Sequence, residues 1–296
     1  MKKKKRAKNI IQKNINIFSC PHCQQELNLI NNSLQCNNNH CFDLSKNGYV
    51  NLLTANIQSN YDKNMFTARN EFIKQGYFKQ IHQLITREIL SNIKTQIKEK
   101  ENNNLKILDA GCGEGSHLSE IKNMIEDEIK YPVSGIGLDL AKEGIYIAAR
   151  EYPGYIWCVG DLAQVPFSNN SVDLIINILS PANYAEFSRL LNENGILIKV
   201  IPASNYLKEL RNLFFNVKDK KEYSNHKVKN LFKEKLTLIS EQTIETKEKI
   251  NNKDYNNLLK MTPLLWDVAP NKLNEIKNNY LKEITIELDI LIGRFK

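Results

Sequence analysis

The sequence has 296 residues, 42% of them hydrophobic, which is enough apolar surface for one large domain and a smaller module and argues against a fully disordered chain. The sequence has no run of roughly 18 to 20 apolar residues, the length needed to cross a membrane. We therefore expect a soluble, cytoplasmic protein. The formal net charge of +8 favours a polyanionic partner, and the six cysteines are too few for a disulfide framework in a chain of this length.

The chain begins with a basic segment, residues 1–17, which we predict to be a disordered tail. It contains seven Lys and Arg residues, and the first acidic residue is Glu26. Clustered cations bind nucleic acid because they release counterions from phosphates. Lys, Asn and Ile are abundant along the whole chain, so a compositional bias of the coding sequence explains the tail equally well.

Residues 18–53 contain the first group of side chains with a specific chemistry. Cys20 and Cys23 are followed, a dozen residues later, by Cys36 and His40. Two tight turns can present such sulfur and nitrogen ligands tetrahedrally to Zn²⁺, which a short segment uses in place of a hydrophobic core. Four protein ligands leave no open position for water, so the pattern predicts a structural zinc ion.

Two other side chains in this segment leave the ligand set open. Cys41 is an alternative fourth ligand, and His22 lies inside the first turn, where we expect its ring to point away from the metal. A chance cluster of reduced side chains in a loop is the alternative to a metal site. Short alternating apolar residues between the two pairs predict small β-hairpins.

Residues 54–104 are predicted to form helices, interrupted near Gly76, that link the module to the rest of the chain, because apolar side chains recur there at mostly helical spacing. From Leu105 onward, short apolar runs alternate with helical segments, which is typical of an α/β fold with a mostly parallel sheet. The expected strands contain residues 107–108, 136–138, 156–159, 174–178 and 196–201.

A glycine-rich turn follows the first of these strands, in the sequence DAGCGEGS from Asp109 to Ser116. Dinucleotide-binding turns have the pattern G-x-G-x-x-G, which would require glycine at position 116. The turn is instead similar to motif I of class I methyltransferases, in which it surrounds the amino acid and ribose of S-adenosylmethionine. The candidate cofactor-binding residues of this turn are Asp109, Gly111, Gly113, Glu114, Gly115 and Ser116.

Acidic residues end the next two strands. Asp139 follows the strand at 136–138, where a carboxylate can accept hydrogen bonds from both ribose hydroxyls of the cofactor. Asp161 follows the strand at 156–159, and in this fold class it would lie near the adenine amino group with Leu162 packed on the ring. The ordered appearance of these features supports a class I (Rossmann-like) methyltransferase domain.

Ser180-Pro181-Ala182 ends the following strand, where methyltransferases place residues that contact the acceptor. Enzymes that act on exocyclic amines commonly have Asn/Asp-Pro-Pro-aromatic there, so this sequence favours a ring nitrogen or another acceptor. No catalytic residue is evident. Asp173 and Glu186 are conceivable bases, although a structural role is favoured for both. Tyr184 or Trp266 could stack on a flipped base, and a core position is equally compatible with Trp266.

Several motifs occur together, in order, from Phe18 to the carboxyl terminus. They are Cys20-x-x-Cys23 with Cys36-x-x-x-His40, KNGYVNLL from Lys46 to Leu53, Ala68-Arg69-x-x-Phe72, the Asp109 to Gly115 turn, and Met261-Thr262-Pro263-x-x-Trp266. This combination resembles the RlmA family, bacterial methyltransferases of guanine N1 in 23S rRNA that include a relative associated with macrolide resistance.

The resemblance implies specific roles. Zinc would be held by Cys20, Cys23, Cys36 and His40. S-adenosylmethionine would be held by Gly115, Ser116 and Asp139, with Phe78 and Tyr206 at positions where the family has Tyr and His. These two positions depart from the family pattern, and the hydrogen bond of a Tyr hydroxyl is lost at Phe78. The family also implies a homodimer whose cleft is lined by both zinc modules, and a hairpin of 23S rRNA as substrate.

We therefore divide the chain into a basic disordered tail (1–17), a zinc-binding module (18–53), a helical linker (54–104) and an S-adenosylmethionine-dependent methyltransferase domain (105–296). The favoured function is methylation of guanine N1 in a 23S rRNA hairpin. A small-molecule methyltransferase would share the cofactor half but would not need a zinc module and a basic tail. A non-catalytic zinc and RNA-binding protein would not need the turn at Asp109 together with Asp139.

Overall fold

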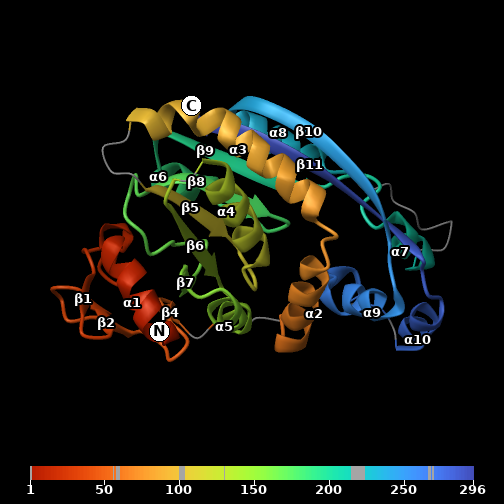
Figure 1. Cartoon of the computed structure of the whole chain (residues 1–296), viewed down its shortest axis with the longest axis horizontal. Helices are drawn as coiled ribbons and strands as arrows, with labels where there is room; N and C mark the ends of the chain where they lie inside the picture. The colour runs from red at the N-terminus through yellow and green to blue at the C-terminus, as the bar shows by residue number, and fades with distance from the viewer. Residues whose placement is uncertain are drawn as a thin grey trace.

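The structure is a computed structural model that describes residues 2–55, 57, 61–99, 104–129, 131–214, 224–265, 268 and 270–296. Its centre is an eight-stranded sheet (Figure 1). In spatial order the strands are β10 (Leu236–Lys249), β11 (Glu283–Phe295), β9 (Leu191–Pro202), β8 (Val172–Ile178), β5 (Leu105–Ala110), β6 (Val133–Asp139), β7 (Ile156–Val159) and β4 (Tyr49–Asn51). The six strands from β9 to β4 run parallel, and β11 and β10 add an antiparallel pair at one edge. The predicted α/β class is confirmed.

The parallel strands are apolar because both faces of the sheet are covered. Neighbouring side chains on β5 illustrate this, since Ile107 packs into one core cluster and Leu108 into the other. The first cluster includes α3 (Lys79–Glu99), α4 (Ser116–Ile129) and α5 (Lys142–Glu151). The second includes α1 (Lys3–Lys13), α6 (Tyr184–Leu190) and α8 (His226–Lys235). Among the described helices, none has the length and apolar character needed to cross a membrane.

A helical group lies beside the sheet, formed by α2 (Lys63–Lys74) and by the connection between β10 and β11. The connection contains α9 (Asn252–Met261), a 3-10 turn (Pro263–Leu265) and α10 (Pro270–Asn278), and α7 (Lys208–Phe214) lies near α10. The Tyr77 hydroxyl donates to Asp254 at 2.9 Å, which joins the end of α2 to α9. The break between α2 and α3 occurs at Gly76, whose φ of +91° is in the left-handed region, so the interrupted helices predicted here are confirmed.

The cysteine-rich segment forms a small antiparallel sheet of β1 (Asn28–Ile30), β2 (Ser33–Gln35) and β3 (Cys41–Asp43). The predicted hairpins are therefore present. The next strand, β4, leaves this small sheet and pairs in parallel with β7. The segment is thus attached to the main sheet by backbone hydrogen bonds as well as by packing.

The prediction of a disordered tail at residues 1–17 is wrong, because residues 3–13 form α1 and residues 15–17 a 3-10 turn. Ala7 and Ile11 are one helical turn apart and both are buried in the second core cluster. The Asn14 amide donates to Ser134 Oγ at 3.1 Å and fixes the end of the helix to the start of β6. The prediction of disorder rested on the basic composition of the segment, in which six of the eleven helix residues are Lys or Arg, and it overlooked this apolar pair.

Candidate functional site

The glycine-rich turn and Asp139 meet at the carboxyl edge of the sheet. The Gly113 N–H donates to Asp139 Oδ2 at 2.8 Å, and the Ala141 N–H donates to Oδ1 at 2.7 Å. Both oxygens are therefore oriented by backbone donors, and each retains lone pairs for further donors. A carboxylate held beside a glycine turn at this edge is the arrangement expected for a nucleoside-binding site.

Glycine is required in the turn by both conformation and space. Gly111, Gly113 and Gly115 have φ values of +83°, +54° and +81°, a region that side chains disfavour. A Cβ on Gly115 would lie 2.4 Å from the ring of Trp157. The backbone can approach its surroundings this closely only because the side chains are absent.

Two further carboxyl groups lie beneath the turn. Burial raises the pKa of Asp109 well above its ordinary value, and the neighbouring carboxylates of Asp139 and Glu114 raise it further. Burial also raises the pKa of Glu114, which accepts a hydrogen bond from the Ser116 hydroxyl. Burial raises the pKa of Asp139 as well, and the positive charge of Arg69 of α2 lowers the pKa of both Glu114 and Asp139. Asp109 and Glu114 thus support the turn from within.

A cavity of about 510 Å³ opens next to Asp139. Leu140 and Val159 line it where β6 and β7 end, and Asn51 lines it at the end of β4. In parallel α/β sheets, ligands bind at these strand ends. The cavity therefore continues the site formed by the turn and Asp139.

A second cavity, of about 370 Å³, lies beyond β7 and β8. Leu162 and the segment from Pro181 to Tyr184 line it. Asp161 lies at the same strand end, where its Oδ1 accepts from the Ala163 N–H at 2.8 Å. The structure therefore places the predicted Leu162 beside the predicted acceptor segment.

Phe78 and Tyr206 have different positions relative to the turn. Phe78 is buried, and its ring lies edge-on to His117 with centroids 5.1 Å apart. Since His117 directly follows Ser116, Phe78 packs at the start of α4. Tyr206 is half-buried in the turn after β9 and packs against the first core cluster.

The four predicted metal ligands converge. One ligand atom from each of Cys20, Cys23, Cys36 and His40 lies within 4.8 Å of all the others, a set that could hold a metal ion. Cys36 Sγ is 3.3 Å from His40 Nδ1, and Cys23 Sγ is 3.6 Å from Cys36 Sγ. A compact set of three sulfurs and one nitrogen matches a closed, tetrahedral zinc site.

The two open alternatives fall outside this set. Cys41 is exposed on β3 and does not belong to the cluster. The His22 ring stacks on Phe42, with centroids 6.0 Å apart and planes inclined by 15°, and is likewise not a member. The preference for His40 over Cys41 and His22 agrees with the geometry.

Two protein families match separate parts of the chain. The RlmA N-terminal family matches residues 18–59, and a methyltransferase domain family matches residues 107–195. YxjB of Bacillus subtilis, named as a candidate 23S rRNA (guanine-N1)-methyltransferase, is 36% identical over 94% of this chain and 96% of its own. The chain belongs to the RlmA family.

Two more distant proteins are also similar to this RlmA family member. The 23S rRNA (guanine(748)-N1)-methyltransferase of Streptomyces fradiae is 25% identical over 90% of each chain. The solved structure of the YcgJ protein of Bacillus subtilis covers 70% of this chain and 98% of that one, with a TM-score of 0.44 at 16% identity, and is too distant to bear on function. A methyltransferase domain and a zinc ribbon in one chain support the two predicted cofactors, S-adenosylmethionine and structural zinc.

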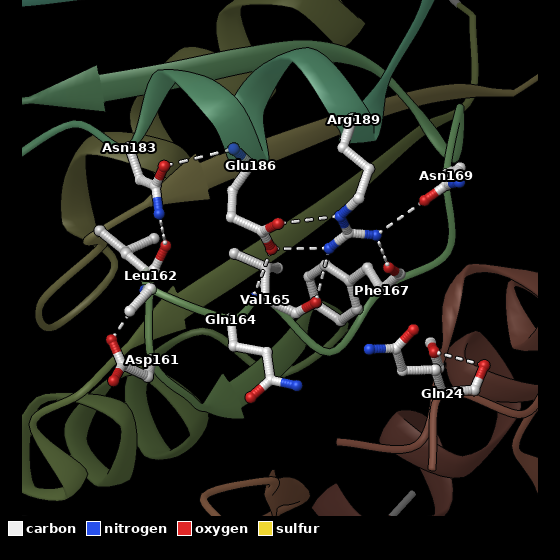
Figure 2. A network of polar contacts seen from close by, with 12 residues as sticks. Gln24, Asp161, Leu162, Gln164, Val165, Phe167, Asn169, Asn183, Glu186 and Arg189 are labelled. Carbon is white, nitrogen blue, oxygen red and sulfur yellow. Dashed lines mark hydrogen bonds and ion pairs between the residues drawn. The ribbon is translucent and has the colours of Figure 1, made fainter. Parts of the chain in front are cut away.

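The two conceivable bases of this RlmA protein are both structural, as favoured from the sequence. Glu186 accepts from the Val165 N–H at 2.7 Å and pairs with Arg189 at 2.7 Å (Figure 2). Asp173 lies on β8 at the opposite edge of the sheet from the glycine turn, where it accepts from the Lys106 N–H at 2.9 Å. Neither carboxylate is available at the site.

Arg189 also holds the segment that joins the cofactor edge to the zinc ribbon. Its guanidinium donates to the carbonyls of Val165 and Phe167, at 2.8 and 2.6 Å, and to Asn169 (Figure 2). Phe167 in turn packs edge-on against Phe18, with ring centroids 5.7 Å apart. Glu186 and Arg189 therefore fix how this RlmA protein presents its zinc ribbon.

Sequence reasoning missed a buried polar group behind the acceptor segment. The Lys199 ammonium donates to the Ser180 carbonyl and to the Asn177 side chain, and burial lowers the pKa of Lys199 to about 8. Asn177 also donates to the carbonyls of Ala110 and Pro181, at 2.6 and 3.0 Å. These bonds tie the acceptor segment to the strand that precedes the glycine turn. A Lys and an Asn inside otherwise apolar strands were the available signal.

Proposed function

We propose that this protein transfers a methyl group from S-adenosylmethionine to N1 of a guanine in a hairpin loop of 23S rRNA. The observation that carries the proposal is the direct hydrogen bond between the glycine turn and Asp139, at the edge where parallel sheets bind nucleosides. The 36% identity to YxjB over nearly the whole of both chains supports the choice of substrate.

The residues proposed to hold the cofactor fit it in chemistry and space. The glycine turn offers backbone without side chains at Gly111, Gly113 and Gly115, and Asp139 offers acceptors to the ribose hydroxyls. The cavity beside Leu140 and Val159 has room for the adenine, and Asp161 follows Val159 after the end of β7. Phe78, which packs at the start of α4, and Tyr206, in the turn after β9, are the positions where the family has Tyr and His.

When bound, S-adenosylmethionine supplies an electrophilic methyl group for in-line transfer to a ring nitrogen. The main task of the protein is then to align the acceptor and exclude water. We assign the alignment to Ser180, Pro181 and Ala182, which Lys199 and Asn177 hold in place. Guanine N1 must lose its proton, which passes to solvent, and the positive charge of Lys199 behind the segment stabilises the negative charge that develops on the base.

The proposal is tested by incubating deproteinised rRNA with radiolabelled S-adenosylmethionine and mapping the product by mass spectrometry. We expect one methyl group on N1 of a guanine in a 23S rRNA hairpin, and none with the Asp139→Ala variant. Label confined to small molecules would show a small-molecule methyltransferase instead. Cofactor binding without any labelled product would argue for a non-catalytic RNA-binding protein.

We also infer that the enzyme works in the cytoplasm as a homodimer, with a substrate cleft lined by both zinc ribbons. The basis for the dimer is the resemblance to the RlmA family, and the basis for the cytoplasm is an rRNA substrate. Sedimentation velocity should give a mass close to twice 34.2 kDa at micromolar concentration. A species of a single chain mass that is fully active would contradict the shared cleft.

A further inference from the structure

The positive charge of this chain is concentrated in its first helix. Residues 2–13 contain seven of the 41 Lys and Arg residues, and all 33 Asp and Glu residues occur at or after Glu26. The remainder of the chain therefore has 34 basic and 33 acidic residues, a formal net charge of +1. The matched RlmA N-terminal region begins at residue 18, so this charge lies outside it.

The helix presents these cations on a fixed surface. Its apolar side chains, Ala7 and Ile11, face the protein core, and Lys5, Arg6 and Lys13 are exposed. The Lys3 ammonium donates to the Arg150 carbonyl at 2.6 Å, and Lys4 and Lys8 are half-buried. Within the described ranges, no carboxylate forms an ion pair with any basic residue of α1. Unpaired cations on a rigid helix form a surface for a polyanion.

The chemistry of α1 distinguishes RNA from a membrane. A helix that lies in a bilayer interface must expose an apolar face to the lipid. In α1, the residues that could form such a face are buried against β7 and the loop at Gly48, where a Cβ would lie 2.7 Å from that of Ala7. The exposed surface is therefore almost wholly polar and basic, which suits phosphates and not lipid chains.

The helix lies at the amino ends of strands β5 and β6, whereas the glycine turn lies at the carboxyl end of β5. Its end is fixed by the Asn14 bond to Ser134, at the start of β6, and by the Asn104 amide, which precedes β5 and donates to Asn14 at 3.2 Å. The glycine turn follows the other end of β5. Six residues at about 3.3 Å each separate the two edges by roughly 20 Å. A phosphate bound by α1 therefore belongs to a nucleotide distant from the reacting guanine.

We propose that the outward face of α1 binds the sugar-phosphate backbone of 23S rRNA outside the hairpin that carries the target guanine. This inference rests on the proposed function, because it takes the same RNA as its ligand. It assigns α1 to substrate affinity and not to the chemical step.

The test uses a variant of the full chain with Lys4→Gln, Lys5→Gln, Arg6→Gln and Lys8→Gln, which leaves Lys3, Ala7 and Ile11 in place. The control variant has Lys247→Gln, Lys249→Gln, Lys260→Gln and Lys277→Gln, four exposed positions elsewhere that remove the same charge. For both, we would measure the Kd for a long 23S rRNA fragment and for the isolated hairpin over a range of salt concentrations, together with steady-state kinetics.

We expect the α1 variant to bind the long fragment at least tenfold more weakly in 0.1 M salt, with a slope of log K against log salt that is smaller by about 3. The KM for this RNA should rise while kcat and the KM for S-adenosylmethionine stay unchanged, and the control variant should behave as the wild type. On the isolated hairpin, all three proteins should be equal, because that RNA does not reach α1.

The inference is overturned if the α1 variant keeps the wild-type salt slope, or if the two variants lose equal affinity. It is also overturned if the α1 variant loses binding to vesicles with anionic lipid while its rRNA binding is unchanged. Failure of the wild type to methylate any RNA would contradict the proposed function instead. If the wild type methylates RNA and the α1 variant does so with the same KM, only the role of α1 fails.

Discussion

Asp139 connects the glycine turn to the end of β6 through both of its oxygens, one accepting from Gly113 and the other from Ala141. An Asp139→Asn substitution preserves size but places an NH₂ group against one of these backbone donors. We expect S-adenosylmethionine to bind about 30-fold more weakly, since losing a hydrogen bond to a charged group costs roughly 2 kcal/mol. Titration calorimetry measures this. Asp127→Asn, an exposed position on α4, is the matched control, and equal affinities in the two variants would remove Asp139 from the site.

The position of Asp139 could be predicted from the sequence, whereas those of Arg69 and Lys199 could not. A strand that runs into a glycine turn brings the turn next to the end of the neighbouring parallel strand. The order of strand, turn and strand along the chain is therefore enough to place Asp139 beside the turn. Arg69 influences Glu114 and Asp139 only because α2 packs across the turn, and Lys199 reaches Ser180 only because β9 lies beside β8. Such contacts depend on packing between segments far apart in the chain.

At the scale of single elements, α1 should contribute to the stability of the fold and not only to its charge. Ile11 is 1% exposed within the second core cluster. Replacing a buried Ile by Ala costs about 2 to 4 kcal/mol, because the transfer free energy is lost and a cavity remains. We expect Ile11→Ala to lower the free energy of unfolding by this amount in urea denaturation, and Gln12→Ala, exposed on the same helix, to leave it unchanged. If Ile11→Ala leaves the midpoint of urea denaturation unchanged, residues 1–17 behave as a disordered tail.

Helices α3 and α4 are joined by two imidazoles, one buried and one half-buried, whose pKa values are lowered. His82 Nε2 and His117 Nδ1 share a hydrogen bond of 2.8 Å. Burial lowers the pKa of His82 to about 4, and burial with the nearby charge of Arg69 lowers the pKa of His117 well below its ordinary value. Both folded-state pKa values lie below the unfolded value of about 6.5, so the unfolded chain binds more protons between pH 6.5 and 4. The pair therefore destabilises the fold as the pH falls through this range.

Substitution of one imidazole isolates this contribution from that of the carboxyl groups and zinc ligands. His82→Gln keeps a hydrogen-bonding side chain beside His117 but does not titrate. Between pH 6.5 and 4 it should lose roughly 3 kcal/mol less stability than the wild type, the amount that corresponds to the shift of His82. His226→Gln, at an exposed histidine, should follow the wild-type curve. Parallel curves for the wild type and His82→Gln would show that His82 is protonated in the folded protein.

The central strands could be predicted because each is an apolar run covered on both faces, as in the four fully buried residues of β7. The edge elements could not. β4 has a burial pattern of half-buried, buried and exposed residues, and its pairing with β7 depends on where the zinc ribbon docks. β10, the strand at the edge of the sheet, exposes alternate residues because successive side chains point to opposite faces and one face is open to solvent. Trp266, considered for stacking on a base, lies outside the described residues.

At the scale of the whole molecule, the zinc ribbon and the methyltransferase domain should unfold together. Phe18, Leu34 and Val50 belong to the same core cluster as strands β6 and β7, and β4 adds to the main sheet. An ion that binds only the folded state stabilises it by mass action, so removing zinc should weaken the whole unit. We expect a chelator, or Cys36→Ser, to lower the Tm of a single calorimetric transition and to abolish RNA methylation.

The matched control for zinc loss is Cys41→Ser, which alters an exposed cysteine beside the ligand set. It should retain one zinc per chain by elemental analysis, together with the wild-type Tm. Loss of zinc from this variant would make Cys41 a ligand in place of His40. A core shared across β4 and Phe18 requires the zinc ribbon and the methyltransferase domain to unfold in one transition. Two separate transitions in the chelated protein, with only the first one shifted, would therefore show that the ribbon folds as an independent unit.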